Sequence, residues 1–192
     1  MKRIVLLFVF LATAGLPRSA ESAEVYLIRG GFNVFSLGMN EMAEKLRSQG
    51  IRASAHGISA WRGIAADIVK RSKTKEVSYP IIYLGHSLGA NAAPQFAAYL
   101  DEHGISADLV IGFDATGRRV FTGGARQVIH YGASRRNPYR PGPGFKGAIR
   151  HVGVGDMGAN HFNIERKDEV QEMVLREVVK VAKSRSRSRY RR

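Results

Sequence analysis

Short apolar segments alternate with segments of helical periodicity along most of this chain, and this alternation limits the folds that it can adopt. The predicted strands are 24–29, 51–56, 79–84, 108–113, 127–131 and 148–154. The predicted helices are 36–49, 61–70, 88–103 and 165–182. Most of the strands lack a strict apolar and polar alternation, so both of their faces are expected to be buried. The sequence therefore predicts an α/β fold, a mostly parallel sheet with helices on both faces.

The amino-terminal segment does not fit this pattern. Two basic residues precede an uncharged apolar run that is too short for an ordinary membrane span, and small residues follow it. We interpret residues 1–23 as a signal peptide, with candidate cleavage signals at 12–14 and 20–22. The leader predicts an exported protein, periplasmic or secreted, or one anchored to the membrane if the leader is not cleaved.

The carboxyl-terminal segment is a run of alternating serine and arginine, 184–192, with Tyr190 as its one apolar residue. Such a segment cannot bury itself and is expected to be disordered, which leaves 24–183 as the folded domain. The chain carries a formal net charge of +14, and much of that excess lies near this end. An anionic membrane surface is a candidate partner for the tail, whereas the leader makes nucleic acid an unfavourable one.

Cysteine is absent from the 192 residues, which excludes a disulfide framework and a thiolate zinc site. Hydrophobic residues make up 44% of the chain, enough for a folded core. The length favours one domain.

The motif G-x-S-x-G occupies Gly85-His86-Ser87-Leu88-Gly89, between a predicted buried strand and an alanine-rich helix. A nucleophilic serine on such a turn needs glycines on either side, because strand and helix approach each other closely there. We therefore take Ser87 as the candidate nucleophile. The alternative is a turn serine that caps the helix.

A serine hydroxyl needs a histidine to accept its proton, and that histidine needs an acid. His161 follows the last predicted strand and precedes the last helix, at the edge of the sheet where parallel strands place reactive groups. Asp114 directly follows the strand 108–113, and Asp156 is the rival acid, close to His161 in sequence. The other histidines have structural interpretations as residues of strands, of a helix end or of the motif itself: His56, His86, His103, His130 and His151.

Acyl transfer also needs backbone N–H groups that stabilise a developing oxyanion. The N–H of Leu88, directly after the nucleophile, is one candidate. The N–H of Phe32, after the turn Gly30-Gly31 that follows the first strand, is the other.

These segments together resemble the α/β-hydrolase superfamily, especially small lipases and esterases. Gly31-Phe32 is similar to the oxyanion turn of lipases, with Gly30 in place of their histidine. The segment 85–89 is similar to their nucleophile elbow, and 111–115 resembles the acid-bearing segment of pancreatic-type lipases. The resemblance implies a minimal α/β-hydrolase fold. The chain departs from the family in being short, with no long insertion that could form a large cap or lid. The most insertion-like segment, 132–147, is rich in arginine, glycine and proline.

We therefore expect a serine hydrolase that cleaves carboxylic esters or thioesters through an acyl-enzyme, with a small-molecule ester or a lipid as substrate. Ser87 would attack, His161 would carry the proton and Asp114 would orient His161. No metal or organic cofactor is expected, since such a triad needs none. The alternative is a non-catalytic binding module on a hydrolase scaffold, with a tail that binds polyanions.

Overall fold

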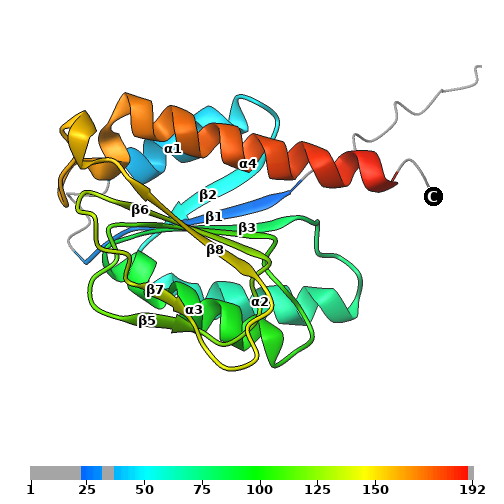
Figure 1. The fold of residues 1–192 in the computed structure, drawn as a ribbon. Helices are drawn as coiled ribbons and strands as arrows, with labels where there is room; N and C mark the ends of the chain where they lie inside the picture. Colours follow the sequence, from blue (N-terminus) through cyan, green and yellow to red (C-terminus); the bar gives the residue numbers. More distant parts are fainter. Residues whose placement is uncertain (1–22, 32–36, 190–192) are drawn as a thin grey trace, which may run out of the picture.

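The computed structural model describes residues 23–31 and 37–189, with side chains up to Ser184, and within them a six-stranded sheet (Figure 1). Its strands are β1 (Glu24–Ile28), β2 (Arg52–His56), β3 (Ile81–His86), β4 (Leu109–Phe113), β6 (Gln127–Gly132) and β8 (Ala148–Gly153). They pair in the order β2-β1-β3-β4-β6-β8, and every pair is parallel. The predicted parallel α/β sheet is confirmed.

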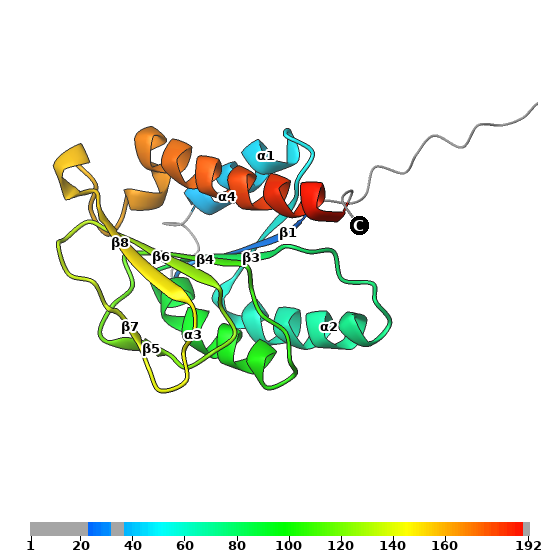
Figure 2. The ribbon, with the colours of Figure 1, turned by 45° about the vertical axis from the view of Figure 1, so that its right-hand side comes forward.

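Helices cover both faces of this sheet, as Figures 1 and 2 show. The helices α1 (Leu37–Arg47) and α4 (Asp168–Arg189) lie on one face. The helices α2 (Trp61–Lys73) and α3 (Leu88–Asp101) lie on the other. Three short 3₁₀ helices complete the described helical elements: η2 (Ile58–Ala60), η3 (Gly155–Met157) and η4 (Ile164–Arg166).

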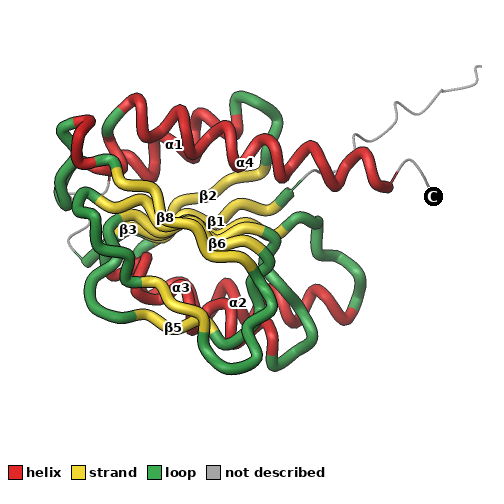
Figure 3. Tube along the Cα trace, viewed as in Figure 1, coloured by secondary structure: helices red, strands yellow, loops and turns green. Residues whose placement is uncertain are grey.

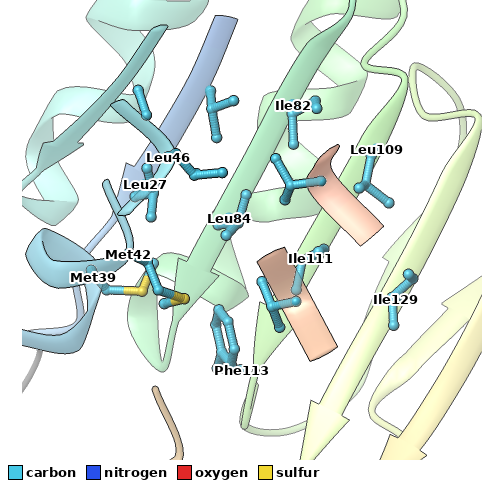
Figure 4. Packing of buried hydrophobic residues seen from close by; sticks show 14 of the residues in the cluster. Leu27, Met39, Met42, Leu46, Ile82, Leu84, Leu109, Ile111, Phe113 and Ile129 are labelled. Carbon is cyan, nitrogen blue, oxygen red and sulfur yellow. The ribbon is translucent and has the colours of Figure 1, made fainter. Parts of the chain in front are cut away.

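The central strands are buried on both faces because their side chains alternate between two apolar layers. On β3, Ile82 and Leu84 join the layer beneath α1 and α4, whereas Ile81 and Tyr83 join the layer above α2 and α3. Figure 4 shows the first layer. Its labelled side chains are Leu27, Met39, Met42, Leu46, Ile82, Leu84, Leu109, Ile111, Phe113 and Ile129. Such two-sided burial explains the apolar runs in the sequence, since each large aliphatic side chain removed from water contributes about 1.5–3 kcal/mol.

A second, smaller sheet lies outside the predicted strands and helices (Figure 3). Strands β5 (Arg119–Phe121) and β7 (Tyr139–Pro141) pair in parallel. The composition of the insertion-like segment 132–147 favours a loop, and this interpretation is wrong for its middle part, which contains β7. Each strand has three residues, too few for a detectable alternation, and only their pairing across the fold makes them strands.

The carboxyl-terminal helix runs further than predicted. Helix α4 continues through Arg189, so it includes residues 184–189 of the segment that the sequence pattern assigns to the tail. Extending an existing helix needs no apolar contact, because each added residue gains a backbone hydrogen bond and arginine is a good helix former.

The predicted leader, 1–23, lies almost wholly outside the described residues, as do the last three residues of the tail, 190–192. In the part of the chain that the structure describes, no helix is both long and apolar enough to cross a bilayer.

The order of the strands reverses between β1 and β3, since β2 follows β1 on one side and β3 lies on the other. In open parallel sheets, ligands bind beyond the carboxyl ends of the strands at such a reversal. The loops after β1 and β3 meet there.

Candidate active site

Ser87 lies on a sharp turn between β3 and α3, with a backbone φ of +52°. A non-glycine residue in this region is strained, and the close approach of strand and helix maintains the strain. A Cβ atom on Gly85 would overlap the backbone of Gly89, and one on Gly89 would overlap the carbonyl of Ile28. The two glycines of the motif are therefore required by packing. The Ser87 N–H donates to the carbonyl of Phe113 on β4 at 3.0 Å, which fixes the turn to the neighbouring strand.

The structure brings the side chains of Ser87, His161 and Asp114 into one hydrogen-bonded row. The Nε2 atom of His161 lies 3.1 Å from the Oγ atom of Ser87. The Nδ1 atom of His161 lies 2.6 Å from the Oδ2 atom of Asp114. When Nδ1 carries the proton that the carboxylate accepts, Nε2 is free to accept the Ser87 proton. The geometry thus places the hydroxyl of Ser87 beside an imidazole nitrogen that can accept its proton.

Asp156, the rival acid, is not in this row. It lies in η3 and is exposed, and no hydrogen bond or ion pair joins it to His161 in the described structure. Asp114 is the carboxylate that contacts His161, and the backbone N–H of Ala133 donates to its other oxygen at 3.2 Å.

The turn that carries Asp114 is held by buried groups beneath it. Asp114 has a φ of +48°, and its N–H donates to the carbonyl of Tyr131 at 2.8 Å. The next N–H, of Ala115, donates to Nε2 of His130 at 3.1 Å. Burial lowers the pKa of His130 to about 4, so the ring is neutral at physiological pH and accepts at that nitrogen. Its other nitrogen lies 3.0 Å from Nδ1 of His151. These two histidines support the site structurally.

A second pair of titratable residues lies behind His161. The Nε2 atom of His86 donates to the backbone carbonyl of His161 at 2.8 Å and lies 3.8 Å from a carboxylate oxygen of Glu165. Glu165 is fully buried, and neither of its carboxylate oxygens has a hydrogen-bond partner among the described residues. Burial raises the pKa of Glu165 to about 7 and lowers the pKa of His86. No sequence signal pointed to this pair, because an acid in the first turn of a predicted helix is ordinarily a solvated residue.

Of the two predicted oxyanion donors, the structure describes Leu88 but not Phe32. Leu88 is the first residue of α3, where a backbone N–H has no partner within the helix. Phe32 lies outside the described residues. The neighbouring Gly31 is described, and a Cβ atom there would lie 2.8 Å from Cδ1 of Leu88. The loop after β1 therefore approaches the elbow closely.

Within the described residues, no group of three or more histidine, aspartate or glutamate side chains could hold a metal ion.

Comparison with solved structures gives matches of similar topology. The thioesterase domain of NocB from the nocardicin cluster matches with a TM-score of 0.51 at 11% identity, over 84% of this chain and 94% of that domain. The type II thioesterase BorB from the borrelidin biosynthetic cluster matches with a TM-score of 0.48 at 10% identity, over 80% of this chain and 91% of that one.

A protein of the α/β hydrolase superfamily from Xanthomonas campestris pv. campestris matches with a TM-score of 0.43 at 12% identity, over 80% of this chain and 98% of that one. No family model and no curated protein sequence matches this chain. At such low identities the structural likeness is evidence of the fold alone. The parallel sheet, the strained elbow after β3 and the likeness to the NocB domain together show that the chain has the α/β-hydrolase fold.

Proposed function

We propose that this protein is a serine hydrolase that cleaves carboxylic esters or thioesters through an acyl-enzyme. The observation that carries the proposal is the row of hydrogen bonds from Asp114 through His161 to Ser87. Helix capping would require none of these contacts, since a cap serine needs only the N–H groups of its own helix. The three residues come from segments far apart in the sequence, so their meeting is a property of the whole fold.

In the first step, Oγ of Ser87 attacks the substrate carbonyl carbon while Nε2 of His161 takes the hydroxyl proton. The carbonyl π electrons move to the oxygen, which becomes an oxyanion. When that oxygen re-forms its double bond, the bond to the leaving alcohol or thiol breaks. His161 gives its proton to the leaving atom, and an acyl ester on Ser87 remains.

In the second step, a water molecule attacks the acyl carbon and gives a proton to Nε2 of His161. Collapse of the second oxyanion breaks the bond to Ser87, which takes the proton back, and the carboxylic acid leaves. Asp114 keeps its negative charge throughout and stabilises the imidazolium form of His161. The N–H groups of Leu88 and Phe32 are the proposed donors to both oxyanions.

The test is covalent labelling with a fluorophosphonate probe, followed by assays on 4-nitrophenyl acetate and on an acetyl thioester. The thioester is included because the NocB domain is a thioesterase. We expect the wild-type protein to be labelled and to hydrolyse at least one of the two. Ser87→Ala should lose both properties, whereas Ser48→Ala, which changes an exposed serine directly after α1, should keep both.

Absence of labelling in the folded wild-type protein would support the alternative, a binding module on a hydrolase scaffold. Export is a separate proposal that rests on the sequence of the leader. It is tested by amino-terminal sequencing of the protein recovered from the periplasm or medium, which should begin after the leader.

A further inference from the structure

A pocket of about 780 Å³ lies beside the acid of the triad. Its wall is formed by the loop after β4, the loop after β6 and the adjoining strand β7, and it includes Asp114. The lining residues are Asp114, Ala115, Thr116, Gly117, Arg118, Ser134, Arg135, Arg136, Asn137, Pro138 and Arg140. The pocket is therefore contiguous with the row of hydrogen bonds that ends at Ser87.

Four arginines line this pocket, one from the first loop, two from the second and one from β7: Arg118, Arg135, Arg136 and Arg140. The one acid in the lining is Asp114, whose carboxylate already contacts His161. None of the four guanidinium groups forms an ion pair with any residue that the structure describes, although six other lysines and arginines do. A concave wall with one sign of charge attracts ligands of the other sign.

The pocket is held in shape by contacts that cross between elements. Asn91, on the first turns of α3, donates to the hydroxyl of Thr116 and accepts from its backbone N–H, both at 2.8 Å. The pairing of β5 with β7 joins the far ends of the two loops. Tyr139, on β7, is buried and donates to the carbonyl of Ala90 at 2.8 Å. The segments that contain the arginines are thus hydrogen-bonded to α3, the helix that follows Ser87.

The lining also excludes an alternative use of the pocket. It contains no large apolar side chain, so it offers little to the acyl chain of a lipid. Large apolar side chains lie elsewhere around the site: Leu88 beside the nucleophile is 46% exposed and Phe162 beside the base is 64% exposed. The apolar and cationic surfaces of the site are therefore separate.

We infer that the arginine pocket binds an anionic group of the substrate, a carboxylate or phosphate carried on its acyl or its alcohol part. This inference rests on the proposed function. Guanidinium groups bind such planar or tetrahedral anions through paired hydrogen bonds. The pocket would therefore favour anionic esters over neutral esters of the same shape.

The first experiment measures binding without catalysis. Inorganic phosphate is titrated calorimetrically into the wild type and Arg135→Gln/Arg136→Gln in a buffer of low chloride. We expect a loss of at least tenfold in affinity in the variant, and a smaller loss in Arg118→Gln. The control, Lys70→Gln/Lys73→Gln, removes the same charge from the carboxyl-terminal end of α2, at the opposite edge of the sheet, and should bind as the wild type does.

The second experiment compares matched esters. The acyl arm uses 4-nitrophenyl hemiglutarate and its neutral methyl ester, and the alcohol arm uses 4-acetoxybenzoate and its neutral methyl ester. The double arginine variant should lose at least tenfold in kcat/KM on the anionic member of one pair, and less than twofold on the neutral members. The ester pair on which the variant loses kcat/KM shows whether the acyl part or the alcohol part of the substrate carries the charge.

Equal phosphate affinity in the wild type and the double arginine variant would overturn the inference. So would equal losses on anionic and neutral esters, because these would mean that the loops had merely been disturbed. The proposed function fails by a different result, the absence of fluorophosphonate labelling, and phosphate binding can be measured whether or not the protein is labelled.

Discussion

The ring of His86 donates a hydrogen bond from Nε2 to the backbone carbonyl of His161, at 2.8 Å. The residue directly before Ser87, the proposed nucleophile, thus holds the main chain of the proposed base. The two rings also lie close, with centroids 5.4 Å apart. Because His161 sits in a loop between two short 3₁₀ helices, this bond restrains a segment that has little regular structure of its own.

Replacing His86 should therefore affect catalysis through His161. We expect His86→Leu to lower kcat about tenfold with little change in KM, and to change the pH profile of kcat, since a loosened imidazole loses its fixed contact with Asp114. His86→Gln, which keeps an N–H donor, should recover much of the loss. The control is His103→Gln, an exposed residue in the turn after α3. Equal kcat in His86→Leu and the wild type would show that the bond has no positioning role.

The proposed role of Asp114 as the acid of a triad is tested by paired amide substitutions. Asp114→Asn should lower kcat by roughly two to four powers of ten, because His161 loses both its tautomer and its charge partner. Asp156→Asn should have little effect, since Asp156 is exposed and does not contact His161. Steady-state assays on one soluble ester compare the two variants. A larger loss of kcat in Asp156→Asn than in Asp114→Asn would identify Asp156 as the acid.

Glu165 should make stability depend on pH. Its folded pKa of about 7 lies above the usual value of 4.5, so the folded state binds the proton more tightly than the unfolded state does. Its contribution to the free energy of unfolding is full below pH 4.5 and is lost as pH rises through 7, an effect on the order of 3 kcal/mol. Urea unfolding of Glu165→Gln and the wild type at pH 5 and pH 8 measures this.

The amide introduced by Glu165→Gln cannot ionise, so the variant should gain stability relative to the wild type between pH 5 and pH 8. Glu169→Gln changes an exposed residue of α4 and serves as the control. A difference between the Glu165→Gln variant and the wild type that is the same at both pH values would mean that Glu165 does not titrate in this range.

The elbow should not tolerate a side chain at Gly89. In Gly89→Ala the Cβ atom would overlap the carbonyl of Ile28, so α3 must move away from β1 and the variant should lose about 2 kcal/mol of stability and most of its activity. Gly63→Ala on α2 is the matched control, because a Cβ there meets no atom. It should be stabilising by about 0.5–1 kcal/mol. Thermal unfolding and ester hydrolysis of both variants check this.

The basic end of α4 is expected to act outside the active site. Truncation after Lys183 removes five arginines and should leave the hydrolysis of soluble esters unchanged. It should weaken binding to vesicles of anionic lipid, by roughly 1 kcal/mol for each charge near the surface, and the difference should shrink as salt rises. Equal vesicle binding by both proteins at low salt would leave the segment with no demonstrated partner.

Local patterns in the amino-acid sequence were sufficient to predict the alternation of strands and helices, because that alternation depends on periodicity and on the burial of short apolar runs. They also located the elbow, since Gly85 and Gly89 are required wherever a strand and a helix approach so closely. His161 is the candidate base because it follows the last strand of the sheet, and parallel strands place their carboxyl ends along one edge.

Which side chains meet along that edge depends on the folded arrangement of the whole chain. Asp114 and Asp156 both precede His161 and both follow strands, and the choice between them depends on strand order and loop direction, which no local pattern encodes. The same holds for the contact of His86 with Glu165, for the pairing of β5 with β7, and for the gathering of arginines from two loops and β7 around one pocket. These contacts join residues far apart in the sequence, so their energies depend on how the sheet and its helices pack.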